Sequence, residues 1–319
     1  MTDQEVLFPE YAIEPACIER LRDAQFLLHD AGPFGSKTLA EYPHNWLLEV
    51  HKNCKASCQT IELKRVVELL SRAMFVRRGN ANYDGKRKWI ENALLEHKIK
   101  PFRAIVSRNG LGDLRSRDYR HVLPLDLLHE HPLWKSPRST SVNRESESMC
   151  RAIAPLLNRS WELVFVDPHF APEERILWCR PIGAFIQEAV KGGRTLKRCE
   201  LHLSSTAAYE HFRRSCLQNL AREVPRDVQL HVYRWKMKEQ EGERFHPRYI
   251  LTDIGGVLIE GGLDQAKREG QTTDVCLLDE KHWRRRWKQY VQDRSGGSAA
   301  FVKKSGDGEY PIKIAGTRP

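Results

Sequence analysis

The chain has 319 residues, of which 40% are hydrophobic and 29% are charged, and its formal net charge is +10. This composition is typical of a globular protein with a sizeable core, and the length suggests two domains. The apolar runs are far shorter than a membrane span, and the N-terminus MTDQEVLFPEY lacks the basic-then-apolar order of a signal peptide. We therefore expect a cytoplasmic protein with no membrane span.

The positive charge lies beyond residue 50, because residues 1–50 hold 3 Lys or Arg against 9 Asp or Glu. Such an excess suits a polyanionic partner such as nucleic acid, although a merely basic globular protein would show the same charge.

The 8 cysteines are scattered along the chain with no C-x-x-C pair, so we interpret them as reduced thiols. His51, Cys54 and Cys58 have ligand-like spacing, but positions on or beside one helix face explain them better than a zinc site does. We expect neither a metal nor a cofactor.

Residues 1–138 predict a mainly helical α+β domain. Apolar residues recur at helical spacing in residues 13–32, 45–57, 61–75 and 89–97, whereas 33–45 predict a loop and 102–107 a strand. The basic residues Arg77, Arg78 and 86–88 could contact a nucleic-acid backbone or form a solvated loop between helices. No motif in this half indicates a reaction.

Residues 131–146 are rich in Ser, Pro and charge and predict an exposed connection at the domain boundary. Beyond it, helices and strands alternate. The expected elements are a helix at 145–157, a strand at 161–166, a helix at 182–190, a strand at 199–203, a helix at 207–222, a strand at 228–235, short strands at 249–251 and 257–259, an apolar run at 274–278 and a helix at 282–294. We expect an α/β domain over residues 139–294 and a basic, flexible tail over 295–319, apart from a short strand at 310–314.

His246 and Arg248 stand just before the short strand at 249–251. Side chains alternate along a strand, so these two point to the same face. A guanidinium forks onto phosphate oxygens, and an imidazole can attack phosphorus or move a proton. The pair therefore suits a phosphate group, although His246 could be an ordinary surface histidine and Arg248 could pair with a nearby carboxylate.

The run His246-x-Arg248-x-x-x-x-Asp253 resembles the H-x-K-x-x-x-x-D signature of the phospholipase D superfamily. Gly261-Gly262 stand near the place of that family's G-S-x-N, and the DPHF sequence at 167–170 looks like the end of its opening strand. The order of elements is also similar to the phospholipase-D-like domain that follows microtubule-interacting-and-trafficking modules. The resemblance implies a mixed sheet flanked by helices over residues 139–294.

The chain departs from the family pattern in several places. Arg248 replaces the usual Lys, Asp264 stands where Asn is usual, and no second motif is present. Active members use two histidines, so a chain with one motif would need a symmetric dimer.

The resemblance implies a phosphodiesterase, such as a metal-independent nuclease in bacterial anti-phage defence. In it His246 would be nucleophile or acid, Arg248 a phosphate clamp and Asp253 an orienting carboxylate. The alternative is a catalytically inactive module that binds nucleic acid, phosphoinositide or a protein partner. A homodimer or a larger protein complex is a further expectation.

Further residues are expected to bind phosphate or nucleic acid because they stand at strand ends, at the glycine turn or on the basic helix. They are His169, Ser204, Ser205, Gly261, Gly262, Arg284 and Arg285. The alternatives are an irregular loop for His169, capping of the next helix for the serines, and solvent-facing positions for the arginines, beside tryptophans that pack on the sheet.

Overall fold

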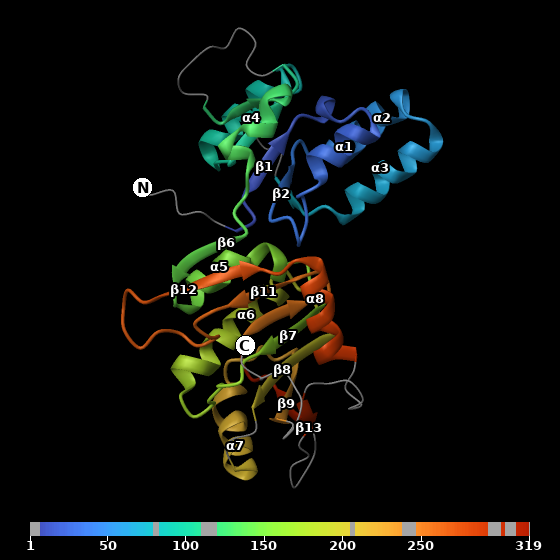
Figure 1. The fold of residues 1–319 in the computed structure, drawn as a ribbon. Helices are drawn as coiled ribbons and strands as arrows, with labels where there is room; N and C mark the ends of the chain where they lie inside the picture. Colours follow the sequence, from blue (N-terminus) through green and yellow to red (C-terminus); the bar gives the residue numbers. More distant parts are fainter. Residues whose placement is uncertain are drawn as a thin grey trace. The chain divides into compact units, whose positions relative to one another are not determined.

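The computed structural model describes residues 7–78, 83–109, 120–204, 208–237, 247–292, 301–303 and 311–318. The chain divides into two compact units, Met1–Arg138 and Ser139–Pro319. Each unit combines helices with one sheet, which confirms the expected α/β class (Figure 1). Within the described ranges, no helix has both the length and the apolar character needed to cross a membrane. All eight cysteines are free thiols.

The first unit is built on a parallel sheet with the strand order β3-β2-β1-β4-β5. The strands are β1 (Glu10–Ile13), β2 (Thr38–Glu41), β3 (Phe75–Arg77), β4 (Ala104–Ser107) and β5 (Val122–Pro124). The helices are α1 (Leu21–Leu28), α2 (Trp46–Ser57), α3 (Thr60–Arg72) and α4 (Trp89–Ile99), with 3-10 turns at Pro15–Cys17, Leu125–Glu130 and Pro132–Trp134.

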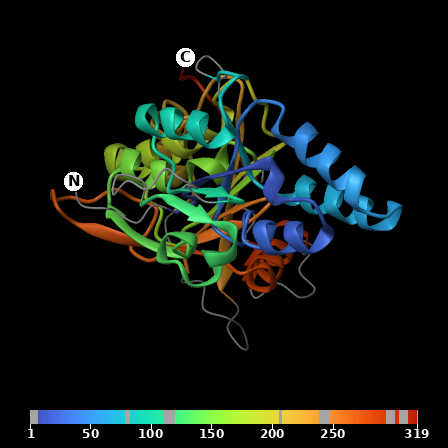
Figure 2. The same cartoon turned by 90° about the horizontal axis from the view of Figure 1, so that it is seen from above.

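The two faces of this sheet bury separate apolar cores. Tyr11 and Ile13 of β1 pack in a core with side chains of α1, α2 and α3, whereas Ala12 packs in a second core with Ile90 and Ala93 of α4. Figure 2 shows α1–α3 and α4 on opposite sides of the sheet. The alternation of successive side chains between two buried faces makes this a doubly wound unit.

The expectation of a mainly helical α+β first unit is correct only in part, because β1, β2 and β3, which the sequence did not predict, join β4 and β5 in a parallel sheet. These strands have three or four residues each, and β1 and β2 are buried on both faces, so they show no polar-apolar alternation. The helix expected at 13–32 shrinks to α1, and the loop expected at 33–45 contains β2. The expected helices at α2, α3 and α4 and the strand at β4 are confirmed.

Arg78 is not available to nucleic acid, contrary to one of the two interpretations of this basic segment. Its side chain is 1% exposed and pairs with Glu10 at 2.7 Å and with Glu96 at 3.1 Å. Its guanidinium also stacks 3.8 Å from the ring centre of Phe102. Arg78 therefore ties together β1, the end of β3 and α4.

The second unit is built on a mixed sheet with the order β13-β9-β8-β7-β10-β11-β12-β6, to which β14 adds beside β9. The strands are β6 (Ser139–Asn143), β7 (Glu162–Val166), β8 (Arg198–Ser204), β9 (Gln229–Met237), β10 (Tyr249–Thr252), β11 (Gly256–Ile259), β12 (Thr272–Leu277), β13 (Phe301–Lys303) and β14 (Ile312–Ala315). Strands β7, β8 and β9 are parallel, and the other pairings are antiparallel.

Helices cover both faces of this sheet. They are α5 (Ser146–Leu157), α6 (Arg180–Val190), α7 (Tyr209–Ser215) and α8 (Glu280–Trp287). A π-helical turn, Arg175–Cys179, precedes α6, and similar turns at Cys216–Leu220 and Lys288–Gln292 extend α7 and α8. Val164 and Val166 pack with Tyr290, just beyond α8, whereas Phe165 points to the other face, 6.0 Å from the ring of Phe185 in α6.

The alternation expected for residues 145–294 is confirmed over the described residues, including the β10–β11 hairpin. The connection expected at 131–146 is wrong in part, because Ser139–Asn143 forms β6. This edge strand is short and its residues are exposed or half-buried, so the sequence shows no apolar signal. The short strand expected at 310–314 is confirmed as β14, which pairs with β9, whereas β13 lies in the segment expected to be a flexible tail.

Candidate functional site

The ends of several strands meet at one edge of the second sheet, which we call the Arg248 edge. It comprises the residues that follow β6, β7, β8 and β11 and those that precede β10. Since β10 runs antiparallel to β7, with Tyr249 opposite Val166, Arg248 lies beside the end of β7. In the same way Arg144, after β6, lies at the start of β12. Sheet pairing therefore gathers residues that are about 100 positions apart.

Asp167 lies at the centre of this edge and is fully buried. Its Oδ1 accepts a hydrogen bond from the backbone N–H of His169 at 2.9 Å, and its Oδ2 accepts one from Leu263 at 2.8 Å. Burial raises the pKa of Asp167, while the two N–H donors and the positive charge of Arg248 oppose that shift. The carboxylate thus joins the loop after β7 to the glycine turn after β11.

The glycine turn, Gly261-Gly262, brings the backbone against charged side chains. Gly262 has φ +112°, and a Cβ there would lie 2.6 Å from Oδ1 of Asp264 and 3.1 Å from Nη2 of Arg144. The backbone N–H of Gly261 donates to Oγ1 of Thr273 at 2.9 Å. A side chain at position 262 would be excluded both by the backbone conformation and by lack of space.

Arg144 is a site residue that sequence reasoning missed. Its guanidinium forms an ion pair with the Asp264 carboxylate, and its Nε donates to the Asp264 carbonyl oxygen at 3.1 Å. Burial raises the pKa of Asp264, and the charge of Arg144 opposes the shift. The partners are 120 residues apart and Arg144 belongs to no motif, so no local signal could have identified the pair.

Arg248 is the second guanidinium of the edge. Its Nη1 donates to the carbonyl oxygen of Glu260 at 3.2 Å, which holds the side chain along the end of β11. Its Nε is buried and has no hydrogen-bond partner among the described residues. The positive charge of Arg248 acts on both Asp167 and Asp264, so two guanidinia and two carboxyl groups form one electrostatic cluster.

An open hollow of about 350 Å³ adjoins this cluster. Its lining includes the basic side chains of Arg144, Lys267 and Arg268, together with Asp264. Lys267 pairs with Glu174 at 3.3 Å, and Arg268 is exposed. The basic side chains outnumber the single carboxylate, so the hollow is suited to an anion.

The other sequence-predicted residues divide between this edge and the opposite one. His169 is exposed in the loop after β7, and Ser204 ends β8, where its backbone N–H donates to the Pro168 carbonyl oxygen at 3.3 Å. Both therefore lie at the Arg248 edge, with Gly261 and Gly262. His246 and Ser205 lie outside the residues that the structure describes.

Asp253 lies at the opposite edge. Its Oδ1 accepts hydrogen bonds from the backbone N–H groups of Trp161 at 2.8 Å and Glu162 at 3.1 Å, at the start of β7. A strand advances about 3.3 Å per residue, so Asp253 lies roughly 16 Å from Arg248. The two residues that the motif groups in sequence are separated by the length of β10.

Arg284 and Arg285 are exposed on α8. This helix lies along β10: the indole N–H of Trp283 donates to the Thr252 carbonyl oxygen at 2.9 Å, and the Arg286 guanidinium lies 5.4 Å from the ring centre of Tyr249. Arg284 pairs with Glu280 at 2.5 Å. The two arginines are thus surface residues of α8, which is not part of the Arg248 edge.

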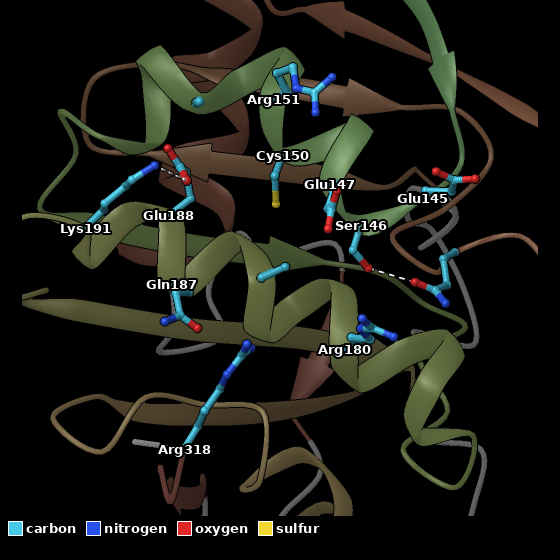
Figure 3. Close-up of a pocket in the computed structure, with 13 residues that line it drawn as sticks. Glu145, Ser146, Glu147, Cys150, Arg151, Arg180, Gln187, Glu188, Lys191 and Arg318 are labelled. Atoms are coloured by element: carbon cyan, nitrogen blue, oxygen red, sulfur yellow. Dashed lines mark hydrogen bonds and ion pairs between the residues drawn. The ribbon is translucent and has the colours of Figure 1, made fainter.

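A larger open groove, of about 730 Å³, runs between α5 and α6 (Figure 3). It adjoins the Arg248 edge, because Ser146 Oγ donates to the Gln265 side chain at 2.8 Å. Its charged lining residues are of both signs: the acidic Glu145, Glu147 and Glu188, and the basic Arg151, Arg180, Lys191 and Arg318. This near-balance of charge favours no class of ligand.

Comparisons of the chain with protein-family models, with curated proteins and with solved structures gave no match.

Proposed function

We propose that the second unit has a phospholipase D-like fold and recognises a phosphodiester group of nucleic acid at the Arg248 edge. The observation that carries this proposal is the guanidinium of Arg248, which is held at the meeting point of strand ends and whose buried Nε has no partner among the described residues. A guanidinium fixed on one side presents its remaining N–H groups in the fork geometry that matches phosphate oxygens.

The surroundings of Arg248 support an anionic ligand. The hollow that adjoins the charge cluster is lined by Arg144, Lys267 and Arg268, and the chain as a whole has a formal charge of +10. A phosphate in this hollow would compete with Asp264 for Arg144.

Hydrolysis at the same edge is the further part of the proposal. It requires His246 beside Arg248 and a second histidine, which a second copy of the chain would supply. Asp253 hydrogen-bonds to the start of β7, at the other end of β10 from Arg248, so the proposal gives it no part in hydrolysis at this edge. If the chain cleaves, we propose a role in bacterial defence against foreign nucleic acid, as the family resemblance implies; without cleavage the edge acts as a binding module.

The test compares wild type, Arg248→Gln and His246→Ala for binding and cleavage of single- and double-stranded DNA and RNA in excess EDTA. Arg248→Gln removes one charge-assisted contact of about 1.5–3 kcal/mol, so it should weaken binding about 10- to 100-fold. It should also reduce the slope of the logarithm of the binding constant against the logarithm of the salt concentration by about one. Arg65→Gln, on the exposed face of α3, removes the same charge elsewhere and serves as the control.

Salt-sensitive binding that Arg248→Gln weakens and Arg65→Gln does not would support recognition at this edge. Chelator-resistant cleavage that His246→Ala abolishes would add catalysis, and binding without cleavage would assign a binding module. Equal effects of the two arginine substitutions would show only a general response to charge and would refute the proposed site.

A further inference from the structure

The first unit contains an open pocket of about 370 Å³ that the proposed function does not use. Its volume falls within the range of about 300–1,000 Å³ that is usual for small-molecule sites. We call it the β1–β2 pocket, because its lining residues follow these two strands or pack beside them. They are Glu14, Pro15, Ala16, Pro43, Asn45, Glu49, Asn53, Tyr83 and Trp89.

One lining residue of the pocket, Glu14, also lies where the strand order of this sheet reverses. The chain moves outward from β1 to β2 and β3 and then crosses to β4 and β5 on the other side of β1. Strand order therefore reverses between β1 and β4, and in parallel α/β sheets such a reversal opens a crevice at the carboxyl ends of the strands. Glu14 directly follows β1 and lies at this reversal. Its Oε2 accepts a hydrogen bond at 2.7 Å from the hydroxyl of Ser107, the last residue of β4, and one at 2.9 Å from the backbone N–H of Arg108, the next residue.

Two aromatic side chains of the lining are held in place by the fold. The indole N–H of Trp89 donates to the Tyr42 carbonyl oxygen at 3.1 Å, and the ring of Tyr83 packs edge-on against Tyr42 with 5.4 Å between ring centres. The fully buried Asn92 fixes the segment beside Tyr83, accepting from the Asp84 N–H and donating to the Asp84 carbonyl oxygen, each at 2.9 Å. These aromatic side chains are therefore preorganised.

The charged side chains that line the pocket, in the part of the unit that the structure describes, are carboxylates. Glu14 is positioned through Oε2, and Glu49 is positioned through Oε1, which accepts from Asn45 at 3.1 Å and from the exposed Lys52 at 3.0 Å. The second oxygen of each carboxylate takes part in none of these bonds. Burial raises the pKa of Tyr83 and the charges of Glu49 and Glu14 add to the rise, so both carboxylates act on the pocket wall.

We propose that the β1–β2 pocket binds a small organic cation, an amine or a guanidinium compound, between the Tyr83 and Trp89 rings and the Glu14 and Glu49 carboxylates. Aromatic faces attract a cation through their quadrupole, and carboxylate oxygens accept its N–H groups. An anionic ligand such as a nucleotide phosphate would find no basic side chain among the described lining residues. The site lies in the first unit, so it does not depend on phosphate recognition by the second.

The experiment titrates the full chain with agmatine by calorimetry and compares wild type with Glu49→Gln and with Glu68→Gln. Glu49→Gln keeps the shape of the side chain and removes its charge. Glu68→Gln removes a 58% exposed carboxylate from α3 and is the matched control. Adenosine monophosphate is titrated in parallel as a planar ligand that carries negative charge.

The proposal expects agmatine to bind wild type with one site per chain, Glu49→Gln to weaken this binding about tenfold or more, and Glu68→Gln to leave it unchanged. A shift of the Trp89 indole N–H resonance in the wild-type protein on adding agmatine provides a second measurement that depends on no substitution. Absence of agmatine binding, equal effects of the two substitutions, or binding of adenosine monophosphate with displacement of agmatine would overturn the proposal.

Discussion

Gly262→Ala tests the close packing of the Arg248 edge. Position 262 has φ +112°, where side-chain-bearing residues are strained, and an added Cβ would lie 2.6 Å from the Asp264 carboxylate and 3.5 Å from that of Asp167. The methyl group cannot fit unless Asp264 moves away from Arg144, its ion-pair partner. The substitution therefore disturbs the backbone and the charge cluster together.

The two effects have separate magnitudes. Backbone strain at a positive φ costs about 1–3 kcal/mol. Separating a largely buried carboxylate from its guanidinium partner costs about 1–3 kcal/mol more, because the charge is left without its hydrogen bonds. We expect the free energy of unfolding of the second unit to fall by about 2–6 kcal/mol.

The measurement is urea unfolding of wild type, Gly262→Ala and Gly270→Ala. Gly270 has φ +80°, but an added Cβ there would meet no atom within 4 Å, so Gly270→Ala carries the backbone strain without the clash. The difference between the two variants isolates the displacement of Asp264. If Gly262→Ala were no less stable than Gly270→Ala, the argument that the turn is packed against the charge cluster would be refuted.

Three further substitutions test other parts of the fold. Arg78→Ala leaves Glu10 and Glu96 without their buried partner and should lower the free energy of unfolding, measured in urea, by about 3–5 kcal/mol. Arg72→Ala removes an exposed ion pair and should lower it by less than about 1 kcal/mol. Similar losses for the two variants would contradict the buried role of Arg78. Asp253→Ala should lower stability by about 1–3 kcal/mol and leave nucleic-acid affinity unchanged, so a loss of affinity alone would be evidence against its placement. Burial raises the pKa of Asp167, so its contribution to the free energy of unfolding is fully present below the unfolded pKa of about 3.9 and is lost as pH rises through the folded pKa. In urea unfolding, Asp167→Asn should flatten the decline in stability as pH rises above about 4, and an unchanged decline would refute this.

Short-range patterns in the sequence predicted much of the secondary structure. The apolar stripes of α2 and α3 and the continuous apolar run of β7 each depend on neighbours within one element. The glycine pair between β10 and β11 likewise indicated a hairpin without knowledge of its surroundings. Such patterns failed for β1 and β2, because a four-residue strand buried on both faces has no alternation to detect.

The residues that form the candidate site were harder to predict from the sequence. The sequence singled out Arg248 because it stands beside a strand in a motif-like run, and it singled out Gly261 and Gly262 because they follow the next strand. It grouped Asp253 with them, although an extended strand of four residues carries Asp253 to the other edge of the sheet. Linear spacing along a strand converts directly into distance, so a motif that spans a strand cannot have both ends in one compact site.

The sequence by itself thus determined the class of the fold, the helices that carry a clear apolar stripe, and the hairpin that begins next to Arg248. Only the tertiary structure decided that Arg144 pairs with Asp264, that Asp167 bonds to the glycine turn, that Arg78 is buried, and that Glu14 lies where the strand order reverses. The physical reason is the range of the interactions. Periodicity and turn chemistry act over a few residues, whereas sheet pairing and burial join residues about 100 positions apart, and the sequence contains no local signal for them.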